Sequence, residues 1–478
     1  MISGASIFRK TKIICTIGPA SDSEQMIEKL AMAGMNVARL NFSHGTYGQH
    51  AARIQAIRHV SSQLGLPLAI LQDLPGPKVR TGELKEDKVW LKKGEELSLT
   101  NKKIIGDEHK VSVSLSSLPR DVNPGDTIFL SDGSIKLVVL GTTSSEIRCE
   151  IIIGGALTPR KGVNIPGVRL SASPVTDQDL SHLRFGIEHG VDFVALSFIG
   201  EAADVLKVKR FLQAQGADVP LIAKIEKQEA VDNIDEIIAE ADGIMVARGD
   251  LGVEIPLRKV PLIQKQIISK CNRMGKPVIV ATQMLESMVY SPYPTRAEVS
   301  DVANAILDGA DAVMLSEETA VGGYPEEAAL MMAKVALEAE TALPYRRILS
   351  QKVETVIPQA DDAISYAACQ IAEQLGAVAI IAYTSSGSTA QRVAKYRPNV
   401  PILAITPKDS IMRKLVLYWG VYPYKVTEYA TVEEVFQQGA ELAIQLGLAK
   451  KGDVAVVTAG VPFGVPGSTN MLKVQKID

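Results

Sequence analysis

The sequence is poor in cysteine and in excess charge of either sign. Its four cysteines (Cys15, Cys149, Cys271 and Cys369) stand far apart without metal-site spacing, which predicts reduced thiols in the core of a cytoplasmic protein. A formal net charge of -3 argues against nucleic acid as the main partner. No apolar run approaches the roughly 18 residues of a membrane span, and residues 1–12 lack the apolar core of a signal peptide. We therefore expect no nucleic-acid partner and no membrane partner.

The chain is long and has an ordinary balance of apolar and charged residues. Its 478 residues are too many for one hydrophobic core and predict about two to four domains. With 46% apolar and 22% charged residues, a mainly disordered chain is excluded.

One pattern repeats through most of the first three quarters of the chain, a short apolar run followed by an amphipathic helical stretch. Strands that alternate with helices predict parallel pairing with right-handed crossovers. Eight such runs are the number that closes a (β/α)8 TIM barrel, and an open doubly wound sheet is the alternative. The predicted strands are 13–16, 37–41, 68–72, 192–196, 221–224, 243–246, 278–281 and 312–315.

The pattern is interrupted once, between residues 76 and 169. Helical periodicity disappears there, and short alternating segments separated by turn signals replace it. Asp132-Gly133 between two of these segments predicts a β-hairpin. We expect a small inserted β-barrel lid over the C-terminal mouth of the TIM barrel, where it excludes water.

A further domain is predicted towards the end of the chain. Helical and extended segments alternate there as in an open α/β sheet with parallel strands. The predicted organisation is a (β/α)8 barrel (1–75 and 170–343), a β lid (76–169) and a C-terminal α/β domain (344–478).

Polar residues gather at the C-terminal ends of the predicted barrel strands, where TIM-barrel enzymes carry their chemistry. Residues two apart in an extended backbone point to the same face, so each such pair can face one cavity. A single charge at a strand end is often only a surface group, but a set over seven strand ends favours an active site. The residues are Arg39, Asn41, Ser43, Asp73, Ser197, Lys224, Glu226, Arg248, Asp250, Thr282, Ser316 and Glu318.

The residue types in this set point to phosphoryl transfer. Glu226 and Asp250 are hard oxygen donors without His or Cys neighbours, so Mg²⁺, or else Mn²⁺, fits them better than zinc. Arg39 and Lys224 supply positive charge for phosphate or carboxylate oxygens, and Gly249 lets backbone N–H groups approach an anion. Neither a Walker loop nor a protein-kinase glycine loop is present, so metal and cations must hold the phosphate.

At these residues the sequence resembles the pyruvate kinase family over essentially its whole length. The order of Lys224-Ile225-Glu226 and Ala247-Arg248-Gly249-Asp250 is very specific. The resemblance implies phosphoryl transfer from phosphoenolpyruvate to ADP, which gives pyruvate and ATP in glycolysis. The other matching stretches are 11–19, 38–45, 281–288 and 311–316.

The resemblance also implies roles for individual residues around phosphoenolpyruvate. Glu226 and Asp250 would hold Mg²⁺, and Lys224 and Arg39 would neutralise the transferring phosphoryl group. Thr282, acting through water with Ser316 and Glu318, would lie on the proton route to the enolate, since a Thr hydroxyl alone is a poor acid near neutral pH. Substrate contacts fall on Arg39, Ser197, Lys224, Gly249, Asp250 and Thr282.

Nucleotide binding is implied at residues of the mouth and of the lid edge. A second Mg²⁺ would arrive with ADP or ATP, and lid closure would bring positive charge to the phosphates. The matching positions are Pro19, Asn41, His44, Arg80 and Lys161.

One departure from the family concerns the monovalent cation. Many members bind K⁺ at the positions of Asn41, Ser43, Asp73 and Leu74 and carry Thr after the Asp and Glu a few residues later, whereas this chain has Leu74 and Lys78. An ammonium is a compact cation that can stand in for K⁺. We therefore predict that Lys78 fills the site and that K⁺ is not required. Alternatively, Lys78 is only a solvated residue of the lid hinge.

The segment Thr384, Ser385, Ser386, Gly387, Ser388 and Thr389 lies between a predicted strand and a predicted helix. Hydroxyls, a glycine and a helix N-terminus form an anion nest, although the same cluster could merely cap the helix. In the family this loop binds an effector phosphate, which implies activation by a sugar phosphate or nucleotide within a homotetramer. Residues 464–469 would complete the pocket, and the end at Asp478 predicts no appended phosphotransfer domain.

Two other functions remain open from the sequence. The first is a barrel lyase or aldolase acting on pyruvate or phosphoenolpyruvate, against which the lid and His44, Arg80 and Lys161 argue. The second is a metabolite-sensing protein that has lost catalysis, which the presence of Lys224 and Glu226 disfavours.

Overall fold

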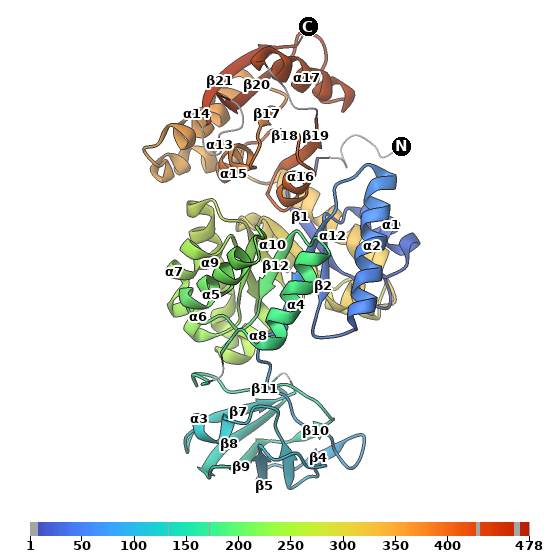
Figure 1. Cartoon of the computed structure of the whole chain (residues 1–478), viewed down its shortest axis with the longest axis vertical. Helices are drawn as coiled ribbons and strands as arrows, with labels where there is room; N and C mark the ends of the chain where they lie inside the picture. The colour runs from blue at the N-terminus through green and yellow to red at the C-terminus, as the bar shows by residue number, and fades with distance from the viewer. Residues whose placement is uncertain (1–7, 132, 172, 427–430, 463–468, 478) are drawn as a thin grey trace.

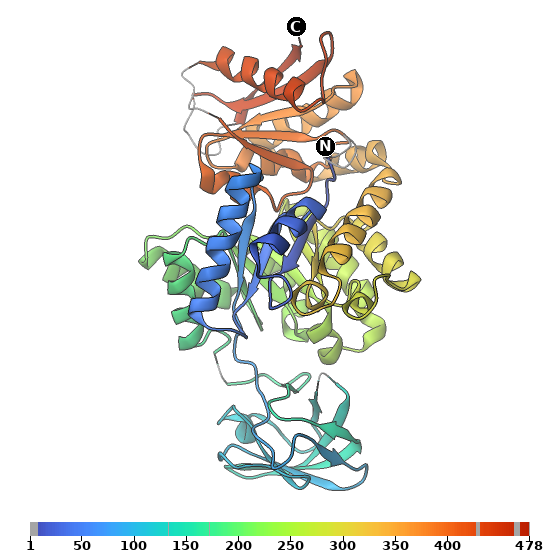
Figure 2. The same cartoon turned by 90° about the vertical axis from the view of Figure 1, so that its right-hand side faces the viewer.

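The computed structural model describes residues 8–131, 133–171, 173–426, 431–462 and 469–477. The chain forms three bodies along its long axis, with the eight-stranded barrel in the middle (Figures 1 and 2). A β body lies at one end of the barrel and an α/β body covers the other. Within the described residues, no helix combines the length and the apolar character that a membrane crossing needs.

The barrel is closed and parallel, which confirms the (β/α)8 prediction and excludes the open sheet. Around the barrel the strand order is β1-β16-β15-β14-β13-β12-β3-β2. Each strand is buried on nearly every residue, as expected for a parallel sheet covered on both faces. The strands are β1 (Lys12–Thr16), β2 (Val37–Asn41), β3 (Ala69–Asp73), β12 (Phe193–Leu196), β13 (Leu221–Ile225), β14 (Gly243–Ala247), β15 (Val278–Ala281) and β16 (Ala312–Leu315).

Apolar side chains fill the inside of the barrel, so the barrel is a packed core without a central channel. Ile14, Phe193 and Met245 belong to this interior cluster, together with Val416 and Leu417 of the C-terminal body. These two residues are almost fully buried, and they extend the core of the barrel at the face opposite the lid. Any chemistry of the barrel is therefore confined to the mouth on the lid side.

Several helices around the barrel begin at side-chain caps. Thr46, Thr176 and Thr295 each form a capping box at the start of a helix. The helices are α1 (Glu24–Ala33), α2 (Tyr47–Leu64), α4 (Asp177–Glu188), α5 (Ala202–Ala214), α6 (Gln228–Asp232), α7 (Ile234–Glu240), α8 (Arg248–Glu254), η1 (Leu257–Lys259), α9 (Val260–Met274), η2 (Glu286–Val289), α10 (Arg296–Leu307), α11 (Glu317–Ala320) and α12 (Pro325–Thr341).

The β body, inserted between β3 and β12, has its own hydrophobic core. Strands β7 and β8 pair antiparallel with Leu130 opposite Ile135, so the predicted hairpin is present, although Asp132 itself lies outside the described residues. The elements are β4 (Val89–Leu91), β5 (Glu96–Thr100), β6 (Lys110–Ser112), α3 (Leu118–Asp121), β7 (Thr127–Leu130), β8 (Ile135–Thr142), β9 (Glu146–Ile153), β10 (Gly155–Leu157) and β11 (Val163–Asn164).

The C-terminal body is an open sheet of order β19-β18-β17-β20-β21, as predicted. Strands β19, β18, β17 and β20 are parallel, and β21 makes the sheet mixed. Strand β21 runs antiparallel to β20 at one edge of the sheet. The sequence did not predict β21, because most of its residues are polar and about half of them are exposed. The sequence did not predict β19 either, because it contains Pro423; β19 lies at the other edge, and an edge strand tolerates proline. The elements are α13 (Tyr345–Gln351), η3 (Lys352–Thr355), α14 (Ala360–Leu375), β17 (Ile380–Tyr383), α15 (Ser388–Lys395), β18 (Ile402–Thr406), α16 (Asp409–Leu415), β19 (Val421–Lys425), α17 (Val432–Gln445), β20 (Val454–Gly460) and β21 (Thr469–Lys476).

Candidate active site

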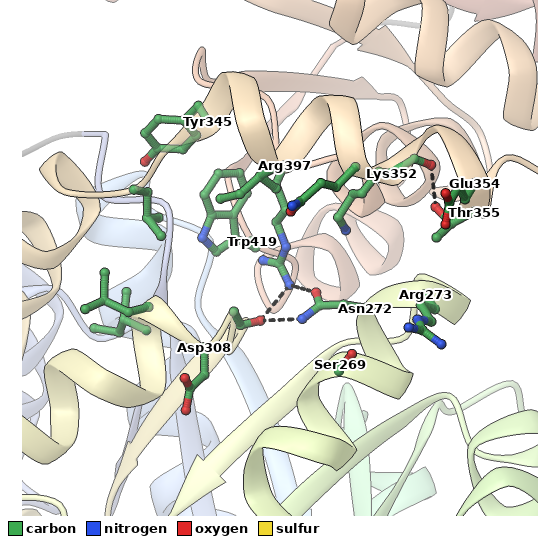
Figure 3. A pocket seen from close by; sticks show the side chains of 16 residues that line it. Ser269, Asn272, Arg273, Asp308, Tyr345, Lys352, Glu354, Thr355, Arg397 and Trp419 are labelled. Atoms are coloured by element: carbon green, nitrogen blue, oxygen red, sulfur yellow. Dashed lines mark hydrogen bonds between the residues drawn. The ribbon is translucent and has the colours of Figure 1, made fainter. Parts of the chain in front are cut away.

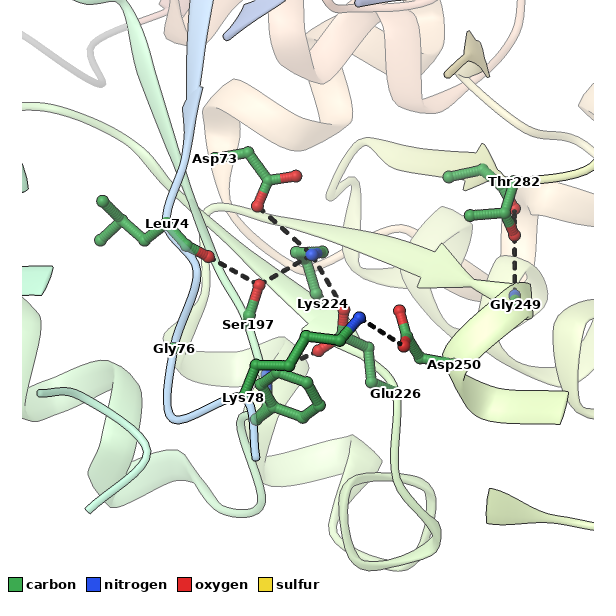
Figure 4. A network of polar contacts seen from close by, with 12 residues as sticks. Asp73, Leu74, Gly76, Lys78, Ser197, Lys224, Glu226, Gly249, Asp250 and Thr282 are labelled. Carbon is green, nitrogen blue, oxygen red and sulfur yellow. Dashed lines mark hydrogen bonds and ion pairs between the residues drawn. The ribbon is translucent and has the colours of Figure 1, made fainter. Parts of the chain in front are cut away.

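Four charged side chains meet at the mouth of the barrel, although they come from strands far apart in the sequence. The Nε of Arg39 donates to Oδ2 of Asp73 at 2.7 Å, and Nζ of Lys224 lies 3.3 Å from Oδ1 of the same carboxylate. Lys224 also contacts Oε1 of Glu226 at 2.8 Å (Figure 4). Asp73 and Glu226 are at most 2% exposed, so two carboxylates and two cations form one desolvated cluster.

Ser197 and the backbone around it complete the surroundings of Lys224. The ammonium donates to Ser197 Oγ at 2.7 Å, and that hydroxyl donates to the carbonyl of Leu74 at 2.7 Å. The backbone N–H of Phe198, a residue with φ 57, donates to Oε2 of Glu226 at 2.7 Å. The side chains of Lys224 and Glu226 are therefore held in fixed positions before any substrate binds.

The charges of this cluster shift one another's pKa values. Burial by itself raises the pKa of Asp73, but Lys224 and Arg39 outweigh burial and bring it below its ordinary value. Burial lowers the pKa of Lys224, and Asp73 and Glu226 outweigh burial and raise it. Lys224 therefore stays a full positive charge at neutral pH, as the binding of a phosphoryl group requires.

Glu226 and Asp250 lie close enough for their charges to interact. Burial raises the pKa of Glu226, Lys224 opposes that rise, and Asp250 adds to it. The described residues contain no cluster of three or more His, Cys, Asp or Glu side chains that could hold a metal ion. Two carboxylates without a third protein ligand fit Mg²⁺, which keeps several waters and takes oxygens from a bound phosphate.

Lys78 extends across the mouth towards this pair of carboxylates (Figure 4). Its Nζ lies 3.6 Å from Oδ1 of Asp250, and both side chains are 28% exposed. The ammonium of Lys78 is thus at the candidate metal site and not beside Asp73, whose two oxygens face Arg39 and Lys224. Two of the other predicted K⁺ ligands also accept hydrogen bonds within the protein: Asn41 Oδ1 from the Ser43 N–H at 3.0 Å, and the Leu74 carbonyl from Ser197.

Thr282 follows β15 in a backbone conformation that is rare for a β-branched residue, with φ 69. Its hydroxyl accepts from the N–H of Gly249 at 2.8 Å and donates to the carbonyl of Ala281 at 2.6 Å. The structure therefore brings Thr282, Gly249 and Asp250 together at one side of the mouth (Figure 4). A left-handed residue held by its neighbours is typical of a strained functional loop.

Arg248 is placed differently from the sequence prediction that it would face the cavity beside Asp250. Residues 248–254 form helix α8, where residues two apart do not share a face. Arg248 contacts Asp301 at 2.7 Å and donates to the carbonyl of Thr282 at 2.6 Å. Arg248 therefore holds the Thr282 loop in place. This role was not predicted, because the sequence pattern indicates extended backbone at residues 248–250, where the structure has a helix.

Glu318 turns its carboxylate towards backbone N–H groups of two loops, its own and the one that follows β15. Oε2 accepts from the N–H of Ser316 at 2.7 Å and Oε1 from the N–H of Leu285 at 3.1 Å, and the residue is 2% exposed. Among the described residues, no hydrogen bond joins Thr282 to Ser316 or Glu318. A proton route through these residues therefore needs intervening water.

The predicted nucleotide residues fall into two groups. Burial lowers the pKa of His44, and the positive charges of Arg80, Lys78 and Arg39 lower it further, which places His44 in a cationic region. Across the lid base, the Lys161 N–H donates to Thr81 Oγ1 at 2.9 Å, and the Thr81 N–H donates to the Lys161 carbonyl at 2.8 Å. Arg80 pairs with Gly162, the residue after Lys161, so Arg80 and Lys161 belong to the same pair of segments. Pro19, exposed after β1, and Asn41, at the end of β2, lie on the barrel side.

Sequence reasoning missed a second partner of Arg39. Its Nη1 donates at 2.9 Å to the hydroxyl of Thr16, which in turn donates to the carbonyl of Leu315. Thr16 is the last residue of β1, so its position at a strand end was a usable signal. No comparable signal was available for the backbone N–H of Phe198.

The predicted effector loop precedes α15 in the C-terminal body. Thr384 Oγ1 accepts from the N–H of Gly387 at 2.8 Å, and Thr389 shares a hydrogen bond of 2.8 Å with Thr469. Ser386 and Ser388, whose hydroxyls lie 3.1 Å apart, are partly exposed, as is Ser385. Of the predicted loop 464–469, residues 464–468 lie outside the described residues.

Comparisons with known proteins agree over the whole chain. The family profile described as "Pyruvate kinase, barrel domain" matches residues 8–329, and "Pyruvate kinase, alpha/beta domain" matches residues 362–475. A pyruvate kinase of Geobacillus stearothermophilus is 49% identical over 472 residues, and one of Staphylococcus epidermidis is 46% identical over 471; each alignment covers 98% of this chain and 80% of the relative. The crystal structure of a pyruvate kinase from Cryptosporidium parvum superposes with a TM-score of 0.94 at 38% identity, covering 100% of this chain and 98% of that one.

Proposed function

This chain belongs to the pyruvate kinase family and is a phosphotransferase with that activity, and we propose how its own residues carry it out and regulate it. The family model and the full-length relatives set the reaction, phosphoryl transfer between phosphoenolpyruvate and ADP. The single observation that carries the assignment of residues is the buried cluster of Arg39, Asp73, Lys224 and Glu226 at the mouth.

Phosphoenolpyruvate binds with its phosphate against the ammonium of Lys224 and the guanidinium of Arg39. Both cations are held by Asp73, so they keep their positions while negative charge moves from one oxygen to another in the transition state. The substrate carboxylate lies at the N-terminus of α8, near Gly249, Asp250 and the Thr282 hydroxyl. Ser197 positions Lys224 through a hydrogen bond of 2.7 Å.

Glu226 and Asp250 would hold the divalent cation, Mg²⁺ or Mn²⁺. Bound there, the metal supplies a Lewis acid that neutralises the phosphoryl oxygens. The contact between Lys78 and Asp250 must loosen for this, and both side chains are exposed enough to move.

ADP binds between the barrel mouth and the lid base. His44 and Asn41 approach from the barrel with Pro19, and Arg80 and Lys161 approach from the lid. After transfer, the enolate takes its proton from water near Thr282, because both oxygens of Glu318 accept from the backbone N–H groups of Ser316 and Leu285. Closure of the lid excludes bulk water, which would otherwise hydrolyse the transferred group.

Release of pyruvate tests the proposal directly. The purified protein should form pyruvate and ATP only when phosphoenolpyruvate, ADP and Mg²⁺ are all present, and a chelator should abolish turnover until Mg²⁺ is restored. Pyruvate formed without ADP would favour a lyase, and no turnover with any diphosphate would favour a binding protein. A coupled spectrophotometric assay separates these outcomes.

We also propose that the enzyme does not require K⁺. Lys78 places an ammonium 3.6 Å from Asp250 at the mouth, and its charge contributes to the cationic region around His44. The oxygens of Asn41 and Leu74 already accept hydrogen bonds from the protein. The internal cation reduces the need for a free monovalent ion.

Activation by a phosphorylated metabolite is proposed at the loop of residues 384–389. A cavity of about 410 Å³ adjoins the loop and is lined by Ser386, Ser388, Arg392 and Lys414. Hydroxyls at the start of α15 suit a phosphate group. Arg392 and Lys414 lie in ion pairs with Asp361 and Asp218, so a phosphate would compete with these carboxylates for their charge. Thr384, Gly387 and Thr389 shape the loop, and Ser385, Ser386 and Ser388 offer the hydroxyls.

A panel of sugar phosphates and nucleotides tests this regulation. At subsaturating phosphoenolpyruvate, an effector should raise the rate and make the velocity curve less sigmoidal. The double substitution Ser386→Ala and Ser388→Ala should raise the half-activating concentration about tenfold, the effect of losing charge-assisted hydrogen bonds, without changing the rate at saturation. Ser62→Ala, at an exposed position of α2, is the matched control. Velocity curves that no compound alters would contradict the proposal.

Assembly into a homotetramer and the domain boundaries stay proposals. Large apolar side chains are exposed after two consecutive barrel strands, which is typical of a surface that another subunit covers: Leu257, Leu262, Tyr290 and Tyr293. Strand β21 also leaves one edge of the C-terminal sheet without a described neighbour. The division at residues 75, 169 and 343 is supported by the separate core of the β body.

A further inference from the structure

A cavity of about 620 Å³ lies between the barrel and the C-terminal body, at the barrel face opposite the active site. Its walls come from the ends of α9 and α10 on one side and from α13, η3 and the segment after α15 on the other (Figure 3). A volume of this size takes a small organic molecule.

Arg397 lines the cavity and has hydrogen-bond donors without a partner among the described residues. Its Nη2 makes all of its described hydrogen bonds, to the Asn272 side chain at 2.5 Å, the Gly309 carbonyl at 3.0 Å and Asp311 Oδ2 at 2.9 Å. The Arg397 side chain is only 8% exposed, and its Nε and Nη1 are buried without a hydrogen-bond partner among the described residues. Unpaired buried donors are costly, so a group that accepts hydrogen bonds is expected beside them.

The rest of the lining adds positive charge and apolar surface. Lys352 and Arg273 also line the cavity, and burial together with nearby Arg397 lowers the pKa of Lys352 to about 7. An anion in the cavity would favour the charged form of this amine. The lining also has two acids, Asp308, which pairs with Lys265, and the exposed Glu354. Arg397 itself pairs with Asp311 through Nη2, so its charge is partly compensated and its free donors are Nε and Nη1. Leu343, Tyr345 and Ile348 offer an apolar wall.

We propose that this cavity binds a small organic anion, a phosphate or carboxylate on an apolar body, with the anionic group against Arg397 and Lys352. The site is separate from the mouth of the barrel and from the loop of residues 384–389. Its ligand would bridge the two bodies, because Arg397 belongs to the C-terminal body while Asn272 and Asp311 belong to the barrel. Asp311 also accepts from the N–H of Val278 at 3.0 Å, at the start of the strand that ends before Thr282.

Tryptophan fluorescence offers a direct test, since the chain has two tryptophans and one of them, Trp419, lines the cavity. The Trp419 ring lies 5.0 Å from Cζ of Arg397, and Trp90 is an exposed residue of the lid. In a Trp90→Phe protein, phenyl phosphate should change Trp419 emission saturably. Inorganic phosphate should bind more weakly, and benzyl alcohol, which lacks the charge, should give no saturable change.

Two substitutions locate the response. Lys352→Met should weaken phenyl phosphate binding about tenfold, the effect of removing one charged partner. Arg397→Lys should weaken it at least as much, and if that protein fails to fold, Lys352→Met alone decides. Ser386→Ala and Ser388→Ala should leave the Trp419 titration unchanged. The proposal is overturned if Trp419 does not respond, if Lys352→Met binds as tightly as its parent, or if the serine substitutions abolish the response.

Discussion

Replacing Lys224 by methionine should lower kcat by about a thousandfold, the largest effect expected of any single substitution in the site. The ammonium contacts Asp73, Glu226 and Ser197, so its removal takes away a cation that faces the transferring phosphoryl group. It also leaves two buried carboxylates with less compensation, and Glu226 would then hold a proton more tightly. The KM for phosphoenolpyruvate should change much less than kcat, because the lost interaction is strongest in the transition state.

The measurement is steady-state pyruvate release at saturating Mg²⁺ and ADP, with circular dichroism to confirm folding. Lys209→Met is the matched control, since Lys209 makes only a surface ion pair of 3.7 Å with Glu240 on a barrel helix. It should stay within about twofold of the parent, because such pairs contribute little. A Lys224→Met protein that keeps a tenth of the parent rate would refute the role given to this ammonium.

Lys78→Glu should convert the enzyme from K⁺ independence to K⁺ dependence. In tetramethylammonium buffer the parent should turn over at its full rate, whereas the variant should lose about a hundredfold, the usual effect of removing one electrostatic contact to the transition state. Added K⁺ should restore most of the loss, because the new carboxylate can hold the ion whose charge Lys78 supplied. The substitution replaces the positive charge of Lys78 near His44 and Asp250 by a negative one.

Ionic strength must be matched with tetramethylammonium chloride, since salt alone screens exposed charges. Lys85→Glu serves as the control, because Lys85 is an exposed lid lysine that pairs with Asp107 at 2.8 Å, away from the mouth. Lys78→Met separates charge from ligand donation: it should lose rate and recover less with K⁺ than Lys78→Glu. A parent enzyme that is inactive until K⁺ is added would remove the basis of the whole argument.

Most of the architecture was predictable from local patterns. Each barrel strand is a short buried run, and the predicted ends differ from the observed ones by at most one residue, as for β3 and β12. Strand ends then placed Arg39, Lys224 and Glu226 at one mouth, because parallel strands of a closed barrel end on the same side. Strands β19 and β21 escaped prediction, because edge strands need neither continuous burial nor a proline-free sequence.

The sequence by itself determined which segments form the barrel strands, which end of each carries polar residues, and which family the motifs resemble. Only the tertiary structure decided which partner each polar group takes: Glu318 accepts from the backbone of Leu285 in the neighbouring loop, Arg248 turns to the Thr282 loop and Lys78 to Asp250. The same holds for Arg397, whose partners Asn272 and Asp311 lie in another part of the chain. Periodicity reports the burial of a side chain along its own element, whereas a hydrogen bond depends on distances between elements that only the folded chain sets.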